Sequence, residues 1–170
     1  NFIWFGGSGM VHKGLNLVLE SFAAMPEYNL TVCGKVENEK DFVKAYKKEL
    51  YESPNIQFFG PIDPGSAEFQ KICMNSVALV YPSCSEGQSG AVVTTMHAGL
   101  IPIVSYQSGV NVEDFGIILK DNTIREIQNA VRRVASLPPE DLAERATKAW
   151  QYARKHHTRE NFASAYRAFV

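Results

Sequence analysis

The chain has 170 residues, of which 45% are hydrophobic and 21% charged, a composition typical of a globular domain and not of a disordered segment. Seventeen Lys and Arg residues against eighteen Asp and Glu give a formal net charge of -1, without the basic excess typical of nucleic-acid-binding proteins. No apolar run approaches the roughly eighteen residues that a membrane span needs. We therefore expect one globular domain over residues 1–170, with no nucleic-acid partner.

The start of the chain and its cysteines indicate the context of the domain. Asn1 leads directly into an apolar run over residues 2–5 with no Met before it, so we expect a fragment of a longer protein. Cys33, Cys73 and Cys84 are odd in number and have no CxxC spacing, which favours free thiols in a reducing compartment. A cytoplasmic location is expected on that ground.

Short apolar runs alternate with helical patterns along the chain. Apolar runs bounded by Gly or Pro indicate strands, whereas apolar residues spaced by three and four indicate amphipathic helices. In chain order the predicted elements are strand 2–5, helix 14–25, strand 30–33, helix 39–51, strand 56–59, helix 66–74, strand 77–81, helix 89–98, strand 101–105 and strand 116–119.

Three more helices are predicted after the last strand. Thr123 and Glu126 form a capping-box pattern that begins the first of them, and Pro138-Pro139 is expected to end it. Apolar residues from 142 to 153 and from 162 to 169 indicate the other two. The alternation of strands and crossover helices predicts an α/β fold with a doubly wound, Rossmann-like parallel sheet, whose ligands bind beyond the carboxyl ends of the strands.

The loop after the first predicted strand is Gly6-Gly7-Ser8-Gly9-Met10-Val11-His12-Lys13-Gly14. Its glycines allow backbone N–H groups to approach a ligand, and Lys13 stands at the start of a helix, where the dipole favours anions. A diphosphate would fit there. The spacing is neither GxGxxG nor a triphosphate loop ending in GK[ST], so a Gly-rich turn with a solvated Lys13 is the alternative.

The second loop of interest is Pro82-Ser83-Cys84-Ser85-Glu86-Gly87-Gln88-Ser89-Gly90, between a strand and a helix. The amides of residues 88–91 are expected to point out of the helix N-terminus, where they could bind a phosphate or sugar hydroxyls. Glu86 could accept hydrogen bonds from sugar hydroxyls or act as a base. A carboxylate that only complements the helix dipole is the alternative.

The two loops, together with the segment Gly99 to Ser105, resemble the donor-binding domain of glycosyltransferase family 4. The family pattern has Gly-Arg and then Lys-Gly near its start, followed by Pro-Ser, Glu-Gly-Phe-Gly, a second Glu eight residues after the first, and Gly-x-Pro-x-Ile. The residues in register with it are Gly7, Lys13, Gly14, Pro82, Ser83, Glu86, Gly87, Met96, Gly99 and Pro102.

The resemblance assigns roles to these positions. It implies that Lys13 neutralises the donor diphosphate and that Glu86, the catalytic candidate, contacts the transferred sugar. The complete set of donor-binding candidates is Gly7, Ser8, Lys13, Glu86, Gly87, Gln88, Ser89, Gly90 and Thr94.

The resemblance also implies the reaction. The chain would be the C-terminal, nucleotide-sugar-binding half of a retaining GT-B glycosyltransferase of glycan biosynthesis. It would move a sugar from a nucleoside diphosphate sugar to an acceptor held by a missing N-terminal domain. No metal or other cofactor is expected, because Lys13 and helix N-termini would stabilise the leaving diphosphate.

Two positions depart from the family pattern. Ser8 stands where the family has Arg, and Thr94 stands where it has the second Glu, which binds the ribose. These departures support an alternative function, a degenerate domain that binds nucleotide or nothing and serves as a scaffold.

Other candidate sites are weaker. The four histidines, His12, His97, His156 and His157, lack zinc-ligand spacing, and the pair at 156–157 is expected to be a solvated helix end. No GxSxG nucleophile elbow is present. A partly basic helix face could contact a membrane surface in the full-length protein, although alternating acidic residues favour plain solvation; its residues are Lys40, Lys44, Lys47 and Lys48.

Overall fold

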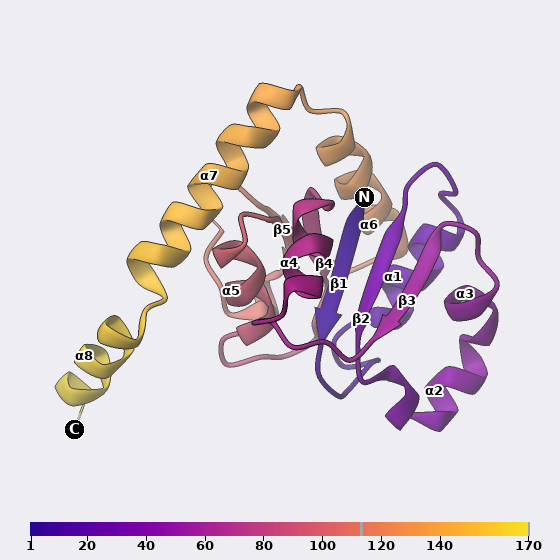
Figure 1. The fold of residues 1–170 in the computed structure, drawn as a ribbon, viewed down its shortest axis with the longest axis horizontal. Helices are drawn as coiled ribbons and strands as arrows, with labels where there is room; N and C mark the ends of the chain where they lie inside the picture. The colour runs from indigo at the N-terminus through magenta and orange to yellow at the C-terminus, as the bar shows by residue number, and fades with distance from the viewer. Residues whose placement is uncertain (113, 170) are drawn as a thin grey trace.

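Six parallel strands form a single sheet in the order β3-β2-β1-β4-β5-β6, in a computed structural model that describes residues 1–112 and 114–169 (Figure 1). Glu113 and Val170, which belong to the predicted domain, lie outside the described residues. The strands are β1 (Phe2–Gly6), β2 (Leu30–Gly34), β3 (Ile56–Gly60), β4 (Ala78–Tyr81), β5 (Ile101–Ser105) and β6 (Ile117–Leu119). The predicted α/β, doubly wound class is confirmed.

Helices cover both faces of this sheet. In Figure 1, α4 lies in front of the strands and α1 behind them, while α7 runs beside α5 and leads to α8 at the C-terminus. The helices are α1 (Leu15–Ala23), α2 (Lys40–Ala45), α3 (Lys47–Tyr51), α4 (Ala67–Met74), α5 (Gly90–His97), α6 (Ile124–Ala135), α7 (Pro139–His156) and α8 (Arg159–Phe169), with short 3-10 helices η1 (Val36–Asn38) and η2 (Tyr106–Ser108).

The core lies between the sheet and these helices. Every residue of β4 and β5 is buried, as expected for parallel strands covered on both faces. Trp4 of β1 is fully buried and stacks on Tyr81 of β4, with ring centroids 6.2 Å apart. The central strands are therefore held rigidly up to their carboxyl ends, where the two loops of interest begin.

The single helix predicted over residues 39–51 is wrong, because the chain forms two helices there, α2 and α3. The backbone of Tyr46 leaves the helical conformation, with φ -110° and ψ 25°, between α2 and α3. The Tyr46 hydroxyl donates a 2.6 Å hydrogen bond to Glu20 of α1. The break lets Phe42 and Leu50 both reach the core, although no Gly or Pro marks it in the sequence. The predicted basic face is consequently divided between two helices.

The boundaries around α6 also differ from the prediction. Pro138-Pro139 does not end α6, which stops at Ala135; instead Pro139 opens α7, where its missing N–H is not needed. Thr123 caps α6 as predicted, by accepting a hydrogen bond from the Glu126 amide. The Glu126 carboxylate reaches back to the amides of residues 120–122.

The last helix, α8, buries none of its described side chains. Phe162, Tyr166 and Phe169 are 74%, 61% and 90% exposed, and the helix projects beyond the sheet (Figure 1). None of the described helices is both long and apolar enough to cross a membrane.

Candidate functional site

The two predicted loops meet at the carboxyl edge of the sheet. β1 and β4 are neighbours, and the strand order reverses direction between them, so their loops open at a topological switch point. Ligands of doubly wound sheets bind at such a crevice. The structure therefore brings the Gly-rich loop and the Glu86 loop to one place, as the sequence predicts.

Gly14 sets the close approach of these loops. Its φ is +69°, a conformation that L side chains rarely adopt, and a Cβ added there would lie 2.3 Å from the carbonyl oxygen of Pro82. Backbone contacts continue the junction: the Cys84 amide donates to the His12 carbonyl at 2.8 Å. The His12 Nε2 lies 2.6 Å from the carbonyl oxygen of Ser85. The glycine of this position is thus required by packing as well as by conformation.

Lys13 and Glu86 form an ion pair across the crevice. The Lys13 Nζ lies 2.6 Å from the Glu86 Oε1, and each side chain is 18% exposed. The same Oε1 accepts hydrogen bonds from the Tyr81 hydroxyl at 2.9 Å and the Ser83 hydroxyl at 3.3 Å. The alternative of a solvated Lys13 is therefore wrong for this structure. The ammonium predicted for the diphosphate and the carboxylate predicted for the sugar are in direct contact.

The pair is ionised over a wide pH range. Burial favours the neutral form of Glu86, but hydrogen bonds and charge from Lys13, Tyr81 and Ser83 outweigh it and lower the pKa of Glu86. Burial also favours the neutral form of Lys13, but its contacts with Glu86 and Tyr81 outweigh burial and raise the pKa of Lys13. At neutral pH the site therefore contains a carboxylate and an ammonium.

Glu39 is a residue of the site that the sequence analysis missed. Its carboxylate accepts hydrogen bonds from the amides of Gly9 and Met10, at 2.5 Å and 3.1 Å. Two amides of the Gly-rich loop are thus already bound to a carboxylate of the chain. Glu39 directly precedes α2, far from the loop in sequence, and no spacing rule connects them.

The N-terminus of α5 is less open than predicted. The Ser89 amide donates to the Ser108 carbonyl at 2.9 Å, so the expectation that all amides of residues 88–91 are available is wrong for Ser89. The Glu86 amide similarly donates to the Gln107 carbonyl. These two hydrogen bonds attach the Glu86 loop to η2. They fix the backbone position from which the Glu86 side chain extends.

The remaining predicted residues are spread around this centre. Gly7 and Ser8 are exposed in the first loop, Gly87 and Gly90 are exposed in the second, and Ser89 is buried.

Thr94 lies half-buried on α5. Eight residues separate Glu86 from Thr94, a little over two turns if all were helical, but α5 begins only at Gly90. Residues 86–89 therefore belong to the loop before α5. Glu86 and Thr94 do not lie on one face of a common helix.

A pocket of about 610 Å³ adjoins Glu86 on the side toward β6. Its wall combines the exposed ring of Tyr106 with the apolar side chains of Val110 and Ile118. Glu86, Ser85 and Gln107 supply polar groups to the same pocket. Such a mixture of a few polar groups and apolar walls is typical of small-molecule sites.

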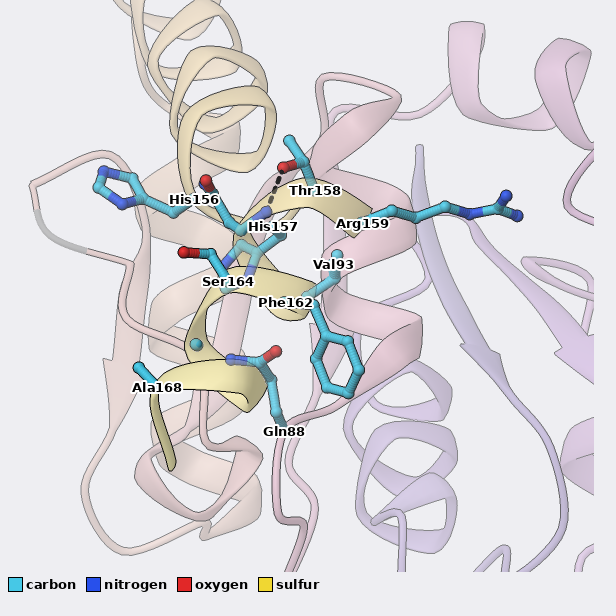
Figure 2. Close-up of a pocket in the computed structure, with 11 residues that line it drawn as sticks. Gln88, Val93, His156, His157, Thr158, Arg159, Phe162, Ser164 and Ala168 are labelled. Atoms are coloured by element: carbon cyan, nitrogen blue, oxygen red, sulfur yellow. Dashed lines mark hydrogen bonds between the residues drawn. The ribbon is translucent and has the colours of Figure 1, made fainter. Parts of the chain in front are cut away.

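Gln88 belongs to a different pocket, of about 890 Å³, between α5 and α8. Figure 2 shows Gln88 and Val93 from the α5 side facing Phe162 and Ala168 from α8. The structure therefore does not place the Gln88 side chain with Lys13 and Glu86.

One histidine, His157, differs in burial from the prediction. His157 is half-buried rather than solvated, and burial, together with the charges of His156 and His97, lowers its pKa. Its carbonyl oxygen lies 3.1 Å from the His97 Nε2. Among residues 1–112 and 114–169, no cluster of three or more His, Cys, Asp or Glu side chains could hold a metal ion.

Known structures share this fold. Sucrose-phosphate synthase from Thermosynechococcus elongatus is similar at TM-score 0.80 and 17% identity, over 99% of this chain and 45% of that one. HepE from Anabaena, solved with UDP and glucose, is similar at TM-score 0.76 and 16% identity, over 91% of this chain and 43% of that one. The C-terminal domain of the group 1 family protein LpcC from Francisella tularensis is similar at TM-score 0.71 and 16% identity, over 93% of this chain and 86% of that domain.

These likenesses establish the fold, and the chain spans less than half the length of the first two proteins. No curated protein sequence matches the chain. The profile of the family described as "Glycosyl transferases group 1" matches residues 1–156. With the paired Lys13 and Glu86 at the switch point of a doubly wound sheet, this match shows that the chain belongs to the glycosyl transferases group 1 family.

Proposed function

We propose that this chain is the donor-binding half of a retaining glycosyltransferase that moves a sugar from a nucleoside diphosphate sugar to an acceptor. The observation that carries the proposal is the meeting of Lys13 and Glu86 at the carboxyl ends of β1 and β4, in a chain of this family. HepE, which has the same fold, was solved with UDP and glucose. A nucleotide sugar offers one group for each side chain, a diphosphate for Lys13 and sugar hydroxyls for Glu86.

The chemistry follows from the charges. Transfer leaves a nucleoside diphosphate, so negative charge grows on the leaving group as the glycosidic bond breaks. An ammonium already fixed at that position stabilises the charge without reorganising solvent. In this proposal Lys13 supplies the charge and no metal ion takes part, so EDTA should not weaken the binding of a nucleoside diphosphate.

The proposal extends to the rest of the protein. The acceptor would be held by an N-terminal domain of the same chain, which closes the other side of the crevice and excludes water. We propose a cytoplasmic enzyme of glycan biosynthesis. A peripheral membrane contact through the lysines of α2 and α3 is a subsidiary proposal, supported by the exposure of Lys40, Lys44, Lys47 and Lys48.

A thermal-shift panel tests the proposal on the 170-residue chain. UDP, GDP, ADP and CDP are added separately, each with and without EDTA, and inorganic phosphate serves as the control. Ligand at one hundred times its Kd stabilises the folded state by about 2.7 kcal/mol, which is easily detected. We expect one nucleoside diphosphate to raise the melting temperature clearly and phosphate not to do so.

The second candidate is a degenerate scaffold domain. Two observations favour it: Lys13 is already paired with Glu86, and the amides of Gly9 and Met10 are occupied by Glu39. A domain of this kind would show no stabilisation by any nucleotide of the panel. That result would contradict the donor-binding proposal.

A further inference from the structure

Three donors converge on one oxygen of Glu86, but they differ in mobility. Lys13 reaches Oε1 through a long flexible side chain, whereas the Tyr81 and Ser83 hydroxyls come from the end of β4 and the residue two positions beyond it. The Tyr81 residue is 1% exposed and Ser83 is fully buried. The Ser83 hydroxyl oxygen lies 3.3 Å from the His12 carbonyl, and the Ser83 carbonyl accepts a 2.6 Å hydrogen bond from Ser105. Tyr81 and Ser83 are therefore fixed parts of the scaffold.

Packing of the Tyr81 ring does not explain why the residue carries a hydroxyl group. It fills the core by stacking on Trp4, with ring centroids 6.2 Å apart, and a phenylalanine ring would fill the same space. A buried hydroxyl is costly unless it finds partners, and here it contacts the Glu86 carboxylate at 2.9 Å as well as the side chains of Ser89 and Lys13. The hydroxyl thus acts on Glu86.

Binding of a donor would change the set of contacts. In the proposed function the diphosphate attracts Lys13, and an ammonium cannot keep a 2.6 Å contact with Glu86 while it turns fully toward a phosphate. Glu86 would then lose its only described cationic partner. The hydroxyls of Tyr81 and Ser83 come from buried residues that remain within hydrogen-bond distance of Oε1, and they would keep one carboxylate oxygen in place.

We propose that Tyr81, supported by Ser83, is a positioning residue that holds the Glu86 carboxylate for the sugar when Lys13 engages the diphosphate. This inference rests on the proposed function and adds a residue to its site. With Oε1 bound to fixed donors, the second carboxylate oxygen of Glu86 is the acceptor offered to a sugar hydroxyl.

The test compares Tyr81→Phe with the wild-type chain by calorimetry. The probes are UDP-glucose, GDP-mannose and ADP-glucose, each measured against its free nucleoside diphosphate. Loss of one hydrogen bond to a charged group should weaken binding of the nucleotide sugar by about 10-fold. Binding of the free diphosphate should change by less than about twofold, because Tyr81→Phe leaves in place the Lys13–Glu86 ion pair with which the diphosphate competes.

A pH series separates positioning from general loosening of the fold. Without the Tyr81 hydroxyl the pKa of Glu86 should rise. The loss of nucleotide-sugar affinity at acid pH, which is the acid limb of the pH profile, should therefore begin at higher pH in Tyr81→Phe. In a Glu86→Gln background, Tyr81→Phe should have no further effect on nucleotide-sugar binding. Ser83→Ala should act in the same direction as Tyr81→Phe with a smaller loss, since its hydrogen bond is longer.

The outcomes distinguish the two proposals. If the wild type binds neither a nucleotide sugar nor a diphosphate, the proposed function fails and this inference fails with it. If the wild type binds a nucleotide sugar and Tyr81→Phe binds it equally well, only the positioning role is overturned. Equal losses for the sugar nucleotide and the free diphosphate, with an unchanged acid limb, would show a purely structural role for Tyr81 and also overturn the inference.

Discussion

The ammonium of Lys13 lies 2.6 Å from the carboxylate of Glu86, so the two side chains assigned to opposite ends of the donor neutralise each other in the free protein. In the proposed function a diphosphate must therefore compete with Glu86 for Lys13. This competition would connect the affinity for the diphosphate to the state of the Glu86 carboxylate, and it changes what each substitution in the pair should do.

Lys13→Ala should weaken the binding of a nucleoside diphosphate by about 10- to 100-fold, because a charge-assisted contact is worth roughly 1.5–3 kcal/mol. The substitution also leaves Glu86 unpaired beside the anion, which adds repulsion. Titration calorimetry of the 170-residue chain measures the loss. Lys35→Ala, which removes an exposed lysine, is the control and should bind as the wild type does. Unchanged affinity in Lys13→Ala would mean that the diphosphate binds elsewhere.

Glu86→Gln should have opposite effects on two ligands. It releases Lys13 from its ion pair, so a free nucleoside diphosphate should bind roughly 3- to 10-fold more tightly, given the modest worth of a partly exposed pair. The intact nucleotide sugar should lose part of this gain or bind more weakly than to the wild type, because its hydroxyls lose a charged acceptor. The ratio of the two affinities is the measurement. A parallel change for both ligands would show that Glu86 does not contact the sugar.

The ion pair should also shape the pH dependence of stability. Because folding lowers the pKa of Glu86, its contribution is present above the ordinary pKa of a glutamate and is lost as pH falls through the folded pKa. Because folding raises the pKa of Lys13, its contribution is present below the ordinary pKa of a lysine and is lost as pH rises through the folded pKa. Urea unfolding should show the wild type losing stability at both extremes relative to the Lys13→Met, Glu86→Gln double variant. A constant difference at all pH values would contradict the pairing.

Gly14→Ala should destabilise the fold by about 2–5 kcal/mol, from left-handed strain together with overpacking against Pro82. The variant should also bind a nucleoside diphosphate more weakly, since the junction that places Lys13 must shift. Gly7→Ala in the same loop is the matched control for stability, because a Cβ there meets no atom within 4 Å. Similar unfolding midpoints for the two variants would refute the steric argument.

Thr94→Glu should tighten the binding of a nucleoside diphosphate and restore preference for ribose over 2′-deoxyribose, if the ribose lies beside α5 as in the family pattern. A glutamate can accept two hydrogen bonds from ribose hydroxyls, worth about 1–3 kcal/mol in place of an uncharged hydroxyl. Competition between a nucleoside diphosphate and its 2′-deoxy form measures the preference, with Thr94→Gln as the uncharged control. No gain in a folded Thr94→Glu variant would favour the degenerate scaffold.

Most of the fold follows from the sequence. All six strands were predicted, because parallel strands buried on both faces appear as short apolar runs between glycines and prolines. The errors lie where tertiary contacts override local patterns. At the break, the Tyr46 hydroxyl donates a hydrogen bond to Glu20 of another helix, and no Gly or Pro in the sequence marks the position. Pro138-Pro139 was assigned to the end of one helix and belongs to the start of the next, since proline suits both places.

The sequence predicted which loops form the candidate site but not the side-chain contacts between them. Lys13 and Glu86 are expected near each other because loops after neighbouring strands share an edge of the sheet, but their ion pair depends on side-chain geometry that spacing does not contain. The roles of Tyr81 and Glu39 were missed for the same reason. Tyr81 appeared only as the last apolar residue of a strand, and Glu39 contacts a loop about thirty positions earlier in the chain.

The exposure of α8 has a consequence for how the chain unfolds. An isolated helix of eleven residues is marginal in water, and α8 buries none of its described side chains against the domain. Its helical hydrogen bonds therefore depend mainly on local interactions, and we expect the cooperative unit of folding to end near His157. We therefore expect the backbone amides of α8 to exchange with solvent through local fraying, and those of β1 and β4 to exchange only when the whole domain opens.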